Sequence, residues 1–251
     1  MSGLKFLDCG DIPVTAYDNA LALSQMTMAF LELGSRPPLK KSAAFPKVKL
    51  LALGGDHSVA LPALRSLNTI YGSPVTVLHF DAHLDTWDPI FPSPWETEQT
   101  HFNHGSVFWL AVKEGLIHNG SSGFMRITAD DIDEIGTQGI IEAIIKRIGT
   151  TLPVYLSFDI DVLDPSVCPG TGTPESGGWT SREVIKILRG LESLNVVGAD
   201  ILEVAPAYDS AGEQTALVAA QVAFEILASW AGRYMANQEQ TSGSEPEKNE
   251  L

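Results

Sequence analysis

Four continuous apolar runs constrain the fold more than any other feature of this chain. The runs are VKLLALGG (48–55), SPVTVLHFDAH (73–83), LPVYLSFDID (152–161) and NVVGADILEV (195–204). Because they are apolar throughout rather than at every second position, they are typical of strands that are buried on both faces. Strands of that kind occur in parallel sheets that helices cover on both sides, so we predict an α/β fold.

Helical patterns lie before, between and after these runs. We expect helices over 18–34 and 137–149, which both end in Gly, over 180–194, where Thr180 and Glu183 have capping-box spacing, and over 213–231. The alternation predicts a single-domain three-layer α-β-α architecture with a mostly parallel sheet over residues 1–236. Residues 237–251 lack apolar periodicity, and we predict that they form a disordered acidic tail.

Charge and cysteine content limit the classes of partner. The 251 residues include 16 Lys and Arg against 31 Asp and Glu, which gives a formal net charge of −15. Such a charge repels nucleic acid and anionic membranes and favours a small cationic molecule or metal ions. The two cysteines, Cys9 and Cys168, lie far apart in the sequence and exclude a disulfide scaffold.

The ends of the chain carry few targeting signals. The N-terminus has no basic region followed by an apolar stretch, and no continuous apolar run approaches the roughly 20 residues that span a bilayer. We therefore expect a soluble chain with the cytoplasm as the default compartment and no membrane partner. The terminal KNEL resembles an ER-retention address, but such an address requires a signal peptide.

Asp and His side chains follow three of the apolar runs, where the predicted strands end. The carboxyl ends of parallel strands meet at one edge of a sheet, and spacings of two residues keep side chains on one face of an extended chain. We therefore expect six of these side chains to form one cluster: His57, Asp81, His83, Asp85, Asp159 and Asp161. Asp56 is expected to lie behind them, Asp88 in a loop, and His79 in the core.

Four carboxylates and two imidazoles suit a hard or borderline divalent cation, and the lack of thiolates argues against a structural zinc site. Six ligands with four negative charges are too many for one ion. They would suit two Mn²⁺-like ions about 3.5–4 Å apart, which can hold a hydroxide near neutral pH.

Three stretches carry a resemblance to a known family. They are GGDHSVALP (54–62), HFDAHLDTW (79–87) and SFDIDVLDPSVCPGTGTPESGG (157–178), and they closely resemble the signatures of the ureohydrolases, the arginase and agmatinase superfamily. The resemblance runs from about Leu4 to Trp230, and HLDTWDP, HGSVF and VAPAYD look more like agmatinases than arginases.

The resemblance implies an arginase-like fold that hydrolyses a guanidino group to urea and an amine by a hydroxide bridging two Mn²⁺ ions. Agmatine, which would give putrescine, is the first expected substrate, and guanidinobutyrate, guanidinopropionate and arginine are the alternatives. Carried over by motif, the six clustered residues would bind the metals. His104 would pass a proton to the leaving amine, with His101 as a competitor, and Glu203 would pair with the guanidinium. The family also implies a homo-oligomer, a trimer or a hexamer.

The chain departs from the family pattern in two places. It begins at LKFLDCGD (4–11), which looks like the family's second strand, and KEGLI (113–117) leads to GFMRI (123–127) without the strand that normally lies between them. Both absent strands are interior in the family's eight-stranded sheet, flanked by strands that this chain retains.

These departures leave two main hypotheses open. One is an active binuclear hydrolase of guanidines. The other is a catalytically impaired relative that binds or regulates, through assembly with full-length subunits. A mononuclear-metal deacetylase on a related fold has less support, because ligands for both metals are present.

Overall fold

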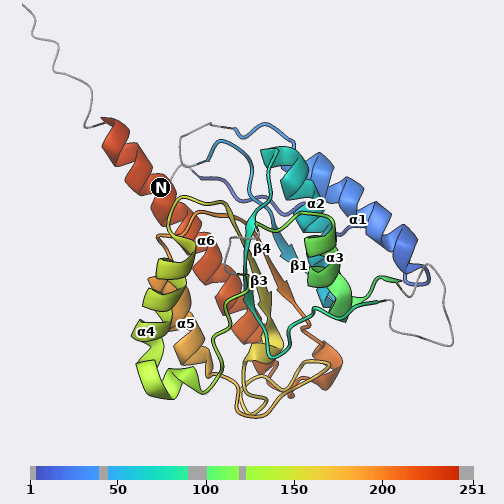
Figure 1. Cartoon of the computed structure of the whole chain (residues 1–251), viewed down its shortest axis with the longest axis vertical. Helices are drawn as coiled ribbons and strands as arrows, with labels where there is room; N and C mark the ends of the chain where they lie inside the picture. Colours follow the sequence, from blue (N-terminus) through green and yellow to red (C-terminus); the bar gives the residue numbers. More distant parts are fainter. Residues whose placement is uncertain (1–3, 40–44, 90–100, 119–122, 243–251) are drawn as a thin grey trace, which may run out of the picture.

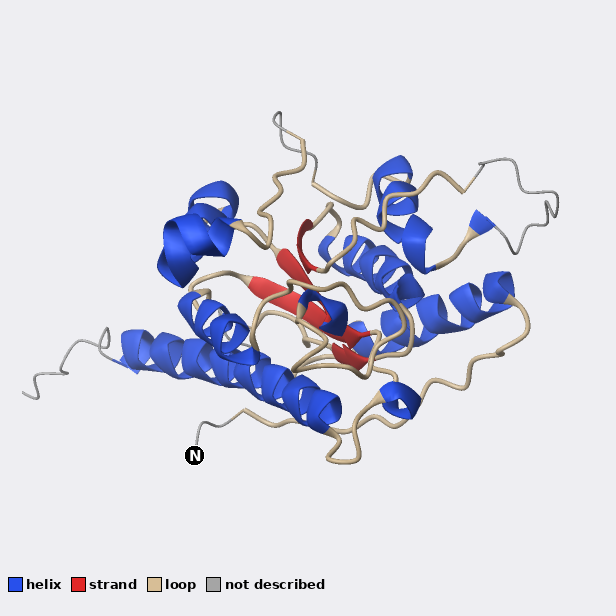
Figure 2. Cartoon of the chain, turned by 90° about the horizontal axis from the view of Figure 1, so that it is seen from below, coloured by secondary structure: helices blue, strands red, loops and turns tan. Residues whose placement is uncertain are grey.

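The computed structural model describes residues 4–39, 45–89, 101–118 and 123–242. Within these residues a parallel sheet lies between two layers of helices, as predicted (Figures 1 and 2). Its strand order is β1-β4-β3-β2, and the strands are β1 (Leu51–Leu53), β4 (Val196–Leu202), β3 (Val154–Asp159) and β2 (Thr76–Phe80). Each strand therefore lies inside one of the four apolar runs of the sequence.

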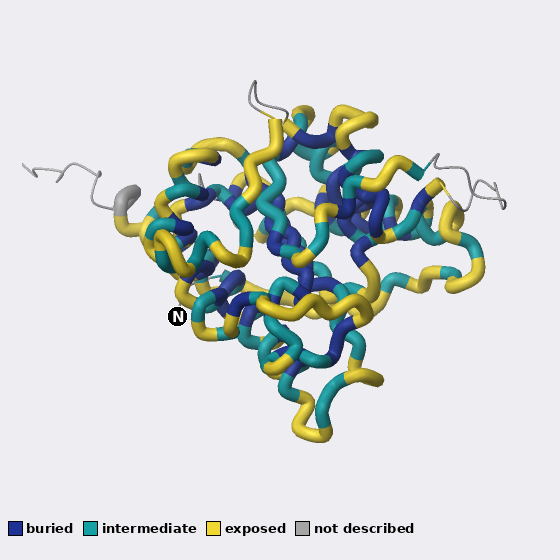
Figure 3. The backbone as a smooth tube through the Cα atoms, turned by 60° about the horizontal axis from the view of Figure 1, so that its bottom comes forward, coloured by how far each residue is buried: buried dark blue, intermediate teal, exposed yellow. Residues whose placement is uncertain are grey.

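The two central strands carry the most buried backbone. Every residue of β3 and β4 is buried, as expected for strands covered on both faces (Figure 3). Alternate residues of β3 face opposite layers: Leu156 and Phe158 pack in one apolar cluster, and Tyr155 packs in the other. The core is thus two apolar layers separated by the sheet.

The helices divide between the two faces of the sheet. One face carries α1 (Asn19–Gly34), α2 (Ala60–Tyr71) and α3 (Val107–Lys113), and the other carries α4 (Asp131–Ile148), α5 (Ser181–Gly190) and α6 (Gln214–Ser242) (Figure 1). The four predicted helices are confirmed, and the capping box of Thr180 and Glu183 is present in α5. Helices α2 and α3 were not predicted from the sequence, and α4 begins earlier than predicted, with a break at Gly136 where φ is 65°.

The predicted disordered tail is wrong over its first six residues. The last helix, α6, continues through Ser242, and its final turns project beyond the other elements (Figure 1). Once a helix is formed, adding a residue such as Gln or Glu costs little, so packing is not needed to extend it. The remainder of that prediction, 243–251, lies outside the described residues.

By length and composition alone, α6 could cross a membrane over Gln214–Glu239. We had predicted no segment of that kind from the sequence. In this fold one side of α6 instead packs into the core: Val222, Ile226, Trp230 and Tyr234 are buried there. We therefore interpret it as a core helix.

Two stretches expected to be strands are irregular instead. Neither 4–11 nor 123–127 pairs with a strand in the part of the chain that the structure describes. The four strands pair directly with one another, so no gap interrupts the sheet among the described residues. A single parallel bridge from Val75 to Ile117 lies beside β2. An extended segment without a neighbour leaves its backbone groups to water, so nothing holds it as a strand.

Candidate metal centre

The chain turns sharply where β1 ends, and this turn carries the first site residue. His57 opens a short 3₁₀ turn, His57–Val59, after Gly54, Gly55 and Asp56. A Cβ on Gly54 would lie 2.5 Å from Cδ2 of Leu202, so a larger residue at this position would require the Leu202 side chain to move. Asp56 accepts a hydrogen bond from the Ser58 amide at 2.8 Å. Asp56 is itself exposed and caps this turn, so it does not lie behind the cluster, contrary to our expectation.

The other site residues lie at the ends of β2 and β3. Asp81, His83 and Asp85 follow β2, while Asp159 ends β3 and Asp161 lies in the next turn, Ile160–Val162. The backbone at Asp85 is left-handed, with φ of 48°, and its carbonyl accepts a hydrogen bond from Phe108 at 3.1 Å. Asp88 lies in the irregular segment beyond, as expected.

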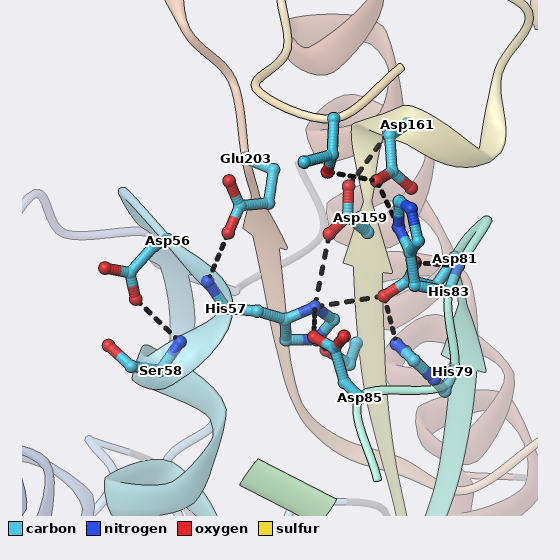
Figure 4. A network of polar contacts seen from close by, with 12 residues as sticks. Asp56, His57, Ser58, His79, Asp81, His83, Asp85, Asp159, Asp161 and Glu203 are labelled. Atoms are coloured by element: carbon cyan, nitrogen blue, oxygen red, sulfur yellow. Dashed lines mark hydrogen bonds and ion pairs between the residues drawn. The ribbon is translucent and has the colours of Figure 1, made fainter. Parts of the chain in front are cut away.

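Three carboxylates surround one nitrogen of His57 (Figure 4). The Nδ1 atom of His57 is 3.1 Å from Oδ2 of Asp81, 3.1 Å from Oδ2 of Asp85 and 3.2 Å from Oδ2 of Asp159. Lone pairs from an imidazole and three carboxylates thus converge on one small volume.

A second group forms around His83. Its Nδ1 atom is 2.9 Å from Oδ2 of Asp161 and 3.4 Å from Oδ1 of Asp81. Asp81 therefore presents one oxygen to each imidazole. The structure brings all six predicted residues together and divides them into two groups that share Asp81.

The chemistry of this donor set fits two divalent cations. His57, Asp81, Asp159 and Asp161 have almost fully buried side chains, and no Lys or Arg among the described residues pairs with the cluster. Two imidazoles cannot balance four buried carboxylates, and buried charges of one sign need a partner. Oxygen and nitrogen donors without thiolate suit Mn²⁺-like ions.

Without a cation the carboxylates compete for protons. Burial and the negative charges of Asp81 and Asp161 raise the pKa of Asp159 to about 9. The hydrogen bond from His57 acts in the opposite direction but is outweighed. The pKa of Asp161 is also raised, by burial and by the charge of Asp81. Hydrogen bonds from His57 and His79 outweigh burial at Asp81 and lower its pKa. A bound cation would take the place of the retained protons.

We expected His79 to lie in the core, but it lies beside the metal site. Its Nε2 atom is 2.7 Å from Oδ2 of Asp81, and its ring lies 4.8 Å from the ring of His57. His79, His57 and Asp81 have donor atoms near enough to hold an ion together. Because His79 already uses its nitrogen on Asp81, we assign it to holding that carboxylate rather than to the cluster itself.

Glu203 lies beside the cluster on the far side of His57 (Figure 4). Its Oε1 atom accepts a hydrogen bond from the His57 amide at 2.7 Å, and its own amide donates to the Gly55 carbonyl at 2.8 Å. The backbone at Glu203 is left-handed, with φ of 59°. Burial raises the pKa of its carboxyl. An uncommon backbone conformation thus holds this carboxylate against the turn that carries His57.

The two candidate proton donors are both exposed. His104 opens the 3₁₀ turn His104–Ser106, lies near enough to Glu203 to act on its charge, and has its ring 6.2 Å from that of Trp87. Among the described residues neither His104 nor His101 forms a hydrogen bond or ion pair with the cluster.

Three residues around the site were not predicted from the sequence. Glu175 is exposed and lies 3.8 Å from Nε2 of His83. Ser157 and Asp200 lie behind His57 in the sheet. Asp200 did carry a signal, because it is the one charged residue in the run VVGADIL.

Fold and site together define an α/β protein with a carboxylate–imidazole metal centre at the carboxyl edge of a parallel sheet. Residues 1–229 match the Arginase family, and the chain belongs to that family.

Relatives with names and solved structures agree with this membership. A Schizosaccharomyces pombe protein named "Putative agmatinase 3" is 46% identical over 256 residues, which cover 90% of this chain and 62% of that protein. The agmatinase of Escherichia coli O7:K1 is 41% identical, over 89% of this chain and 70% of its own length. The proclavaminate amidino hydrolase from Streptomyces clavuligerus has a TM-score of 0.77 at 35% identity, covering 91% of this chain and 76% of that one. The chain thus spans less than two thirds of the length of its S. pombe relative.

Proposed function

We propose that this chain hydrolyses a guanidino compound to urea and an amine, with agmatine as the first substrate and putrescine as its product. One observation carries the proposal: Asp81 presents one oxygen to His57 and the other to His83, so that the six donors form two adjacent groups. The names of the S. pombe and E. coli relatives support the choice of agmatine.

The two groups assign ligands to two Mn²⁺ ions. His57, Asp85 and Asp159 would hold one ion, His83 and Asp161 the other, and Asp81 both. When bound, such a pair supplies a nucleophilic water at neutral pH.

Glu203 is suited to bind the guanidinium. A carboxylate can accept two parallel hydrogen bonds from a planar guanidinium, and Glu203 is held in place by the His57 amide. The amide that holds Glu203 belongs to His57, which is itself one of the six clustered residues. The carbon of a guanidinium bound by Glu203 would therefore lie close to the metal ligands.

His104 is suited to protonate the leaving amine. Histidine is the side chain that exchanges protons most readily near neutral pH. His104 lies close enough to Glu203 for their charges to interact, so it lies near the bound guanidinium.

The charge around the site favours a substrate with a cationic tail. An exposed carboxylate, Glu175, lies 3.8 Å from His83, and no basic side chain of the described residues pairs with the cluster. A distal ammonium would meet an acidic rim, whereas a distal carboxylate would be repelled.

A comparison of guanidines tests this assignment. We expect kcat/KM with Mn²⁺ to be highest for agmatine and lower for arginine and guanidinobutyrate, which carry a carboxylate. Highest turnover of guanidinobutyrate would move the assignment to another guanidino hydrolase. No turnover of any guanidine by a folded chain that binds metal would support the impaired relative instead.

A further inference from the structure

A buried carboxylate behind the metal centre has no cation of its own. Asp200 lies in β4 with an exposure of 0%, and no Lys or Arg of the described residues pairs with it. An isolated charge in such a position is costly unless hydrogen bonds and an opposite charge compensate for it. A positive charge on His57 would lower the pKa of Asp200.

Two donors bind the Asp200 carboxylate directly. The hydroxyl of Tyr155 donates to Oδ2, and the amide of Phe158 donates to Oδ1 at 3.2 Å. The hydroxyl of Ser157 lies opposite Asp200 in the register of β3 and β4 and acts as a third donor, which opposes the rise that burial causes in the pKa of Asp200. Tyr155 and Ser157 are themselves buried. Asp200 is therefore held by the neighbouring strand β3 on the face of the sheet that carries His57.

Ser157 connects this carboxylate to the metal centre. Its Oγ atom lies 2.9 Å from Nε2 of His57, the nitrogen on the opposite side of the ring from the cluster. The hydroxyl of Ser157 has a single proton, and it donates this proton to Asp200. The oxygen of Ser157 is then free to accept, and Nε2 of His57 must carry the proton.

We propose that Asp200, acting through the hydroxyl of Ser157, is a positioning residue that fixes His57 with Nε2 protonated and the lone pair of Nδ1 directed at the metal site. The inference rests on the metal centre of the proposed function. A histidine ligand whose second nitrogen donates to a fixed acceptor is held in one tautomer and one orientation, and the hydrogen bond makes it a stronger donor to the metal.

The chain offers a matched pair of variants to test this role. Ser157→Ala removes the link to His57 and leaves the Tyr155 bond to Asp200 in place. Tyr155→Phe removes a buried hydroxyl from the same carboxylate and leaves the link to His57 in place. Each variant loses one buried hydrogen bond to Asp200. If these bonds only stabilised the fold, the two variants would change metal binding to the same extent.

Direct Mn²⁺ titration by calorimetry, with electron paramagnetic resonance to detect coupling between paired ions, gives a readout that needs no substrate. We expect Ser157→Ala to bind one of its two ions 10- to 100-fold more weakly, the usual effect of losing a partner of a metal-ligating histidine. Tyr155→Phe should keep the paired signal and stay within about threefold of the wild-type affinity, and Ser157→Thr, which keeps the hydroxyl, should restore binding.

Unchanged binding of both ions by Ser157→Ala, or equal weakening in Ser157→Ala and Tyr155→Phe, would overturn the inference, as would a wild-type chain that binds no Mn²⁺. Should Ser157→Ala fail to fold, Asp200→Asn carries the same test with little change in volume. The proposed function fails separately, if wild-type protein with both ions bound releases no urea from any guanidine.

Discussion

Asp161 and His83 define one half of the proposed metal centre, with Nδ1 of His83 2.9 Å from Oδ2 of Asp161. We expect Asp161→Asn and His83→Ala to abolish metal-dependent turnover and to reduce bound Mn²⁺ below two ions per chain, because losing one ligand disrupts the charge balance and geometry of a bridged pair. Metal analysis and urea release measure both effects.

A suitable control for Asp161→Asn is Glu175→Gln, which removes the same charge at an exposed position 3.8 Å from His83. Its metal content should equal that of the wild type. Full turnover in Asp161→Asn or His83→Ala would contradict the assignment of these residues.

His104 and His101 can be separated by parallel substitutions. We expect His104→Ala to lower kcat by about 10²- to 10⁴-fold, the usual contribution of a positioned proton donor, with Mn²⁺ content unchanged. His101→Ala should leave kcat close to that of the wild type. If His104→Ala keeps full activity, proton transfer belongs to His101 or to solvent.

The location of the six clustered residues could be predicted at this scale, since each lies shortly after or at the end of a strand that an apolar run predicts. The support behind them could not. Ser157 and Asp200 lie inside strands, so their neighbours depend on the register of the sheet. Ser157 lies opposite Asp200 only because β3 pairs with β4 in this register. Our prediction for Asp56 was wrong because a residue that caps the turn and a residue that lies behind the ligands could both directly precede His57 in the sequence.

At the scale of elements, the amine of Lys49, two residues before β1, lies in an unusual environment against α6. Lys49 has its Nζ atom 4.2 Å from the centre of the Phe45 ring and 5.4 Å from that of Trp230, without a hydrogen-bond partner. Burial, with a smaller contribution from the charge of Arg233, lowers the pKa of Lys49 from 10.5 to about 7.

This lowered pKa predicts a pH-dependent cost to stability. Below pH 7 the amine is charged in both states and the full penalty applies; between about 7 and 10.5 the folded state loses its proton first, so stability rises with pH. We expect Lys49→Met to raise the free energy of unfolding at pH 6 by about 1–3 kcal/mol, with a smaller gain at pH 9.

Urea denaturation of wild type and Lys49→Met at both pH values measures the difference, and Lys47→Met, at an exposed position, is the control. Effects of other titrating groups cancel between variant and wild type. An equal gain at pH 6 and pH 9 would show that packing rather than charge sets the stability of this contact.

Helix positions were predictable where periodicity and caps coincide, as at α5, where Thr180 and Glu183 form both bonds of the capping box. The missed α2 begins right after the 3₁₀ turn of His57 and carries Pro62 in its first turn, where a missing amide proton costs nothing. The end of α6 was missed for a different reason, because helix propagation does not require an apolar face.

For the whole molecule, the class of fold followed from the four apolar runs, but the extent of the sheet did not. Residues 4–11 and 123–127 have strand-like sequences, and a strand forms only where a neighbour offers backbone groups. Over the described residues the chain instead has four strands, and the carboxyl ends of β1, β2 and β3 carry the six clustered residues. The site therefore depends on both edge strands of this sheet, β1 and β2, as well as on the central strand β3.

The measurement that tests this account most directly is urea release from agmatine by the purified chain after incubation with Mn²⁺, with and without a chelator. We predict turnover that is lost on chelation and restored by added Mn²⁺, because the two groups around His57 and His83 need cations to balance their carboxylates. Absence of urea from agmatine and other guanidines, in a sample that binds two ions and melts cooperatively, would contradict the account.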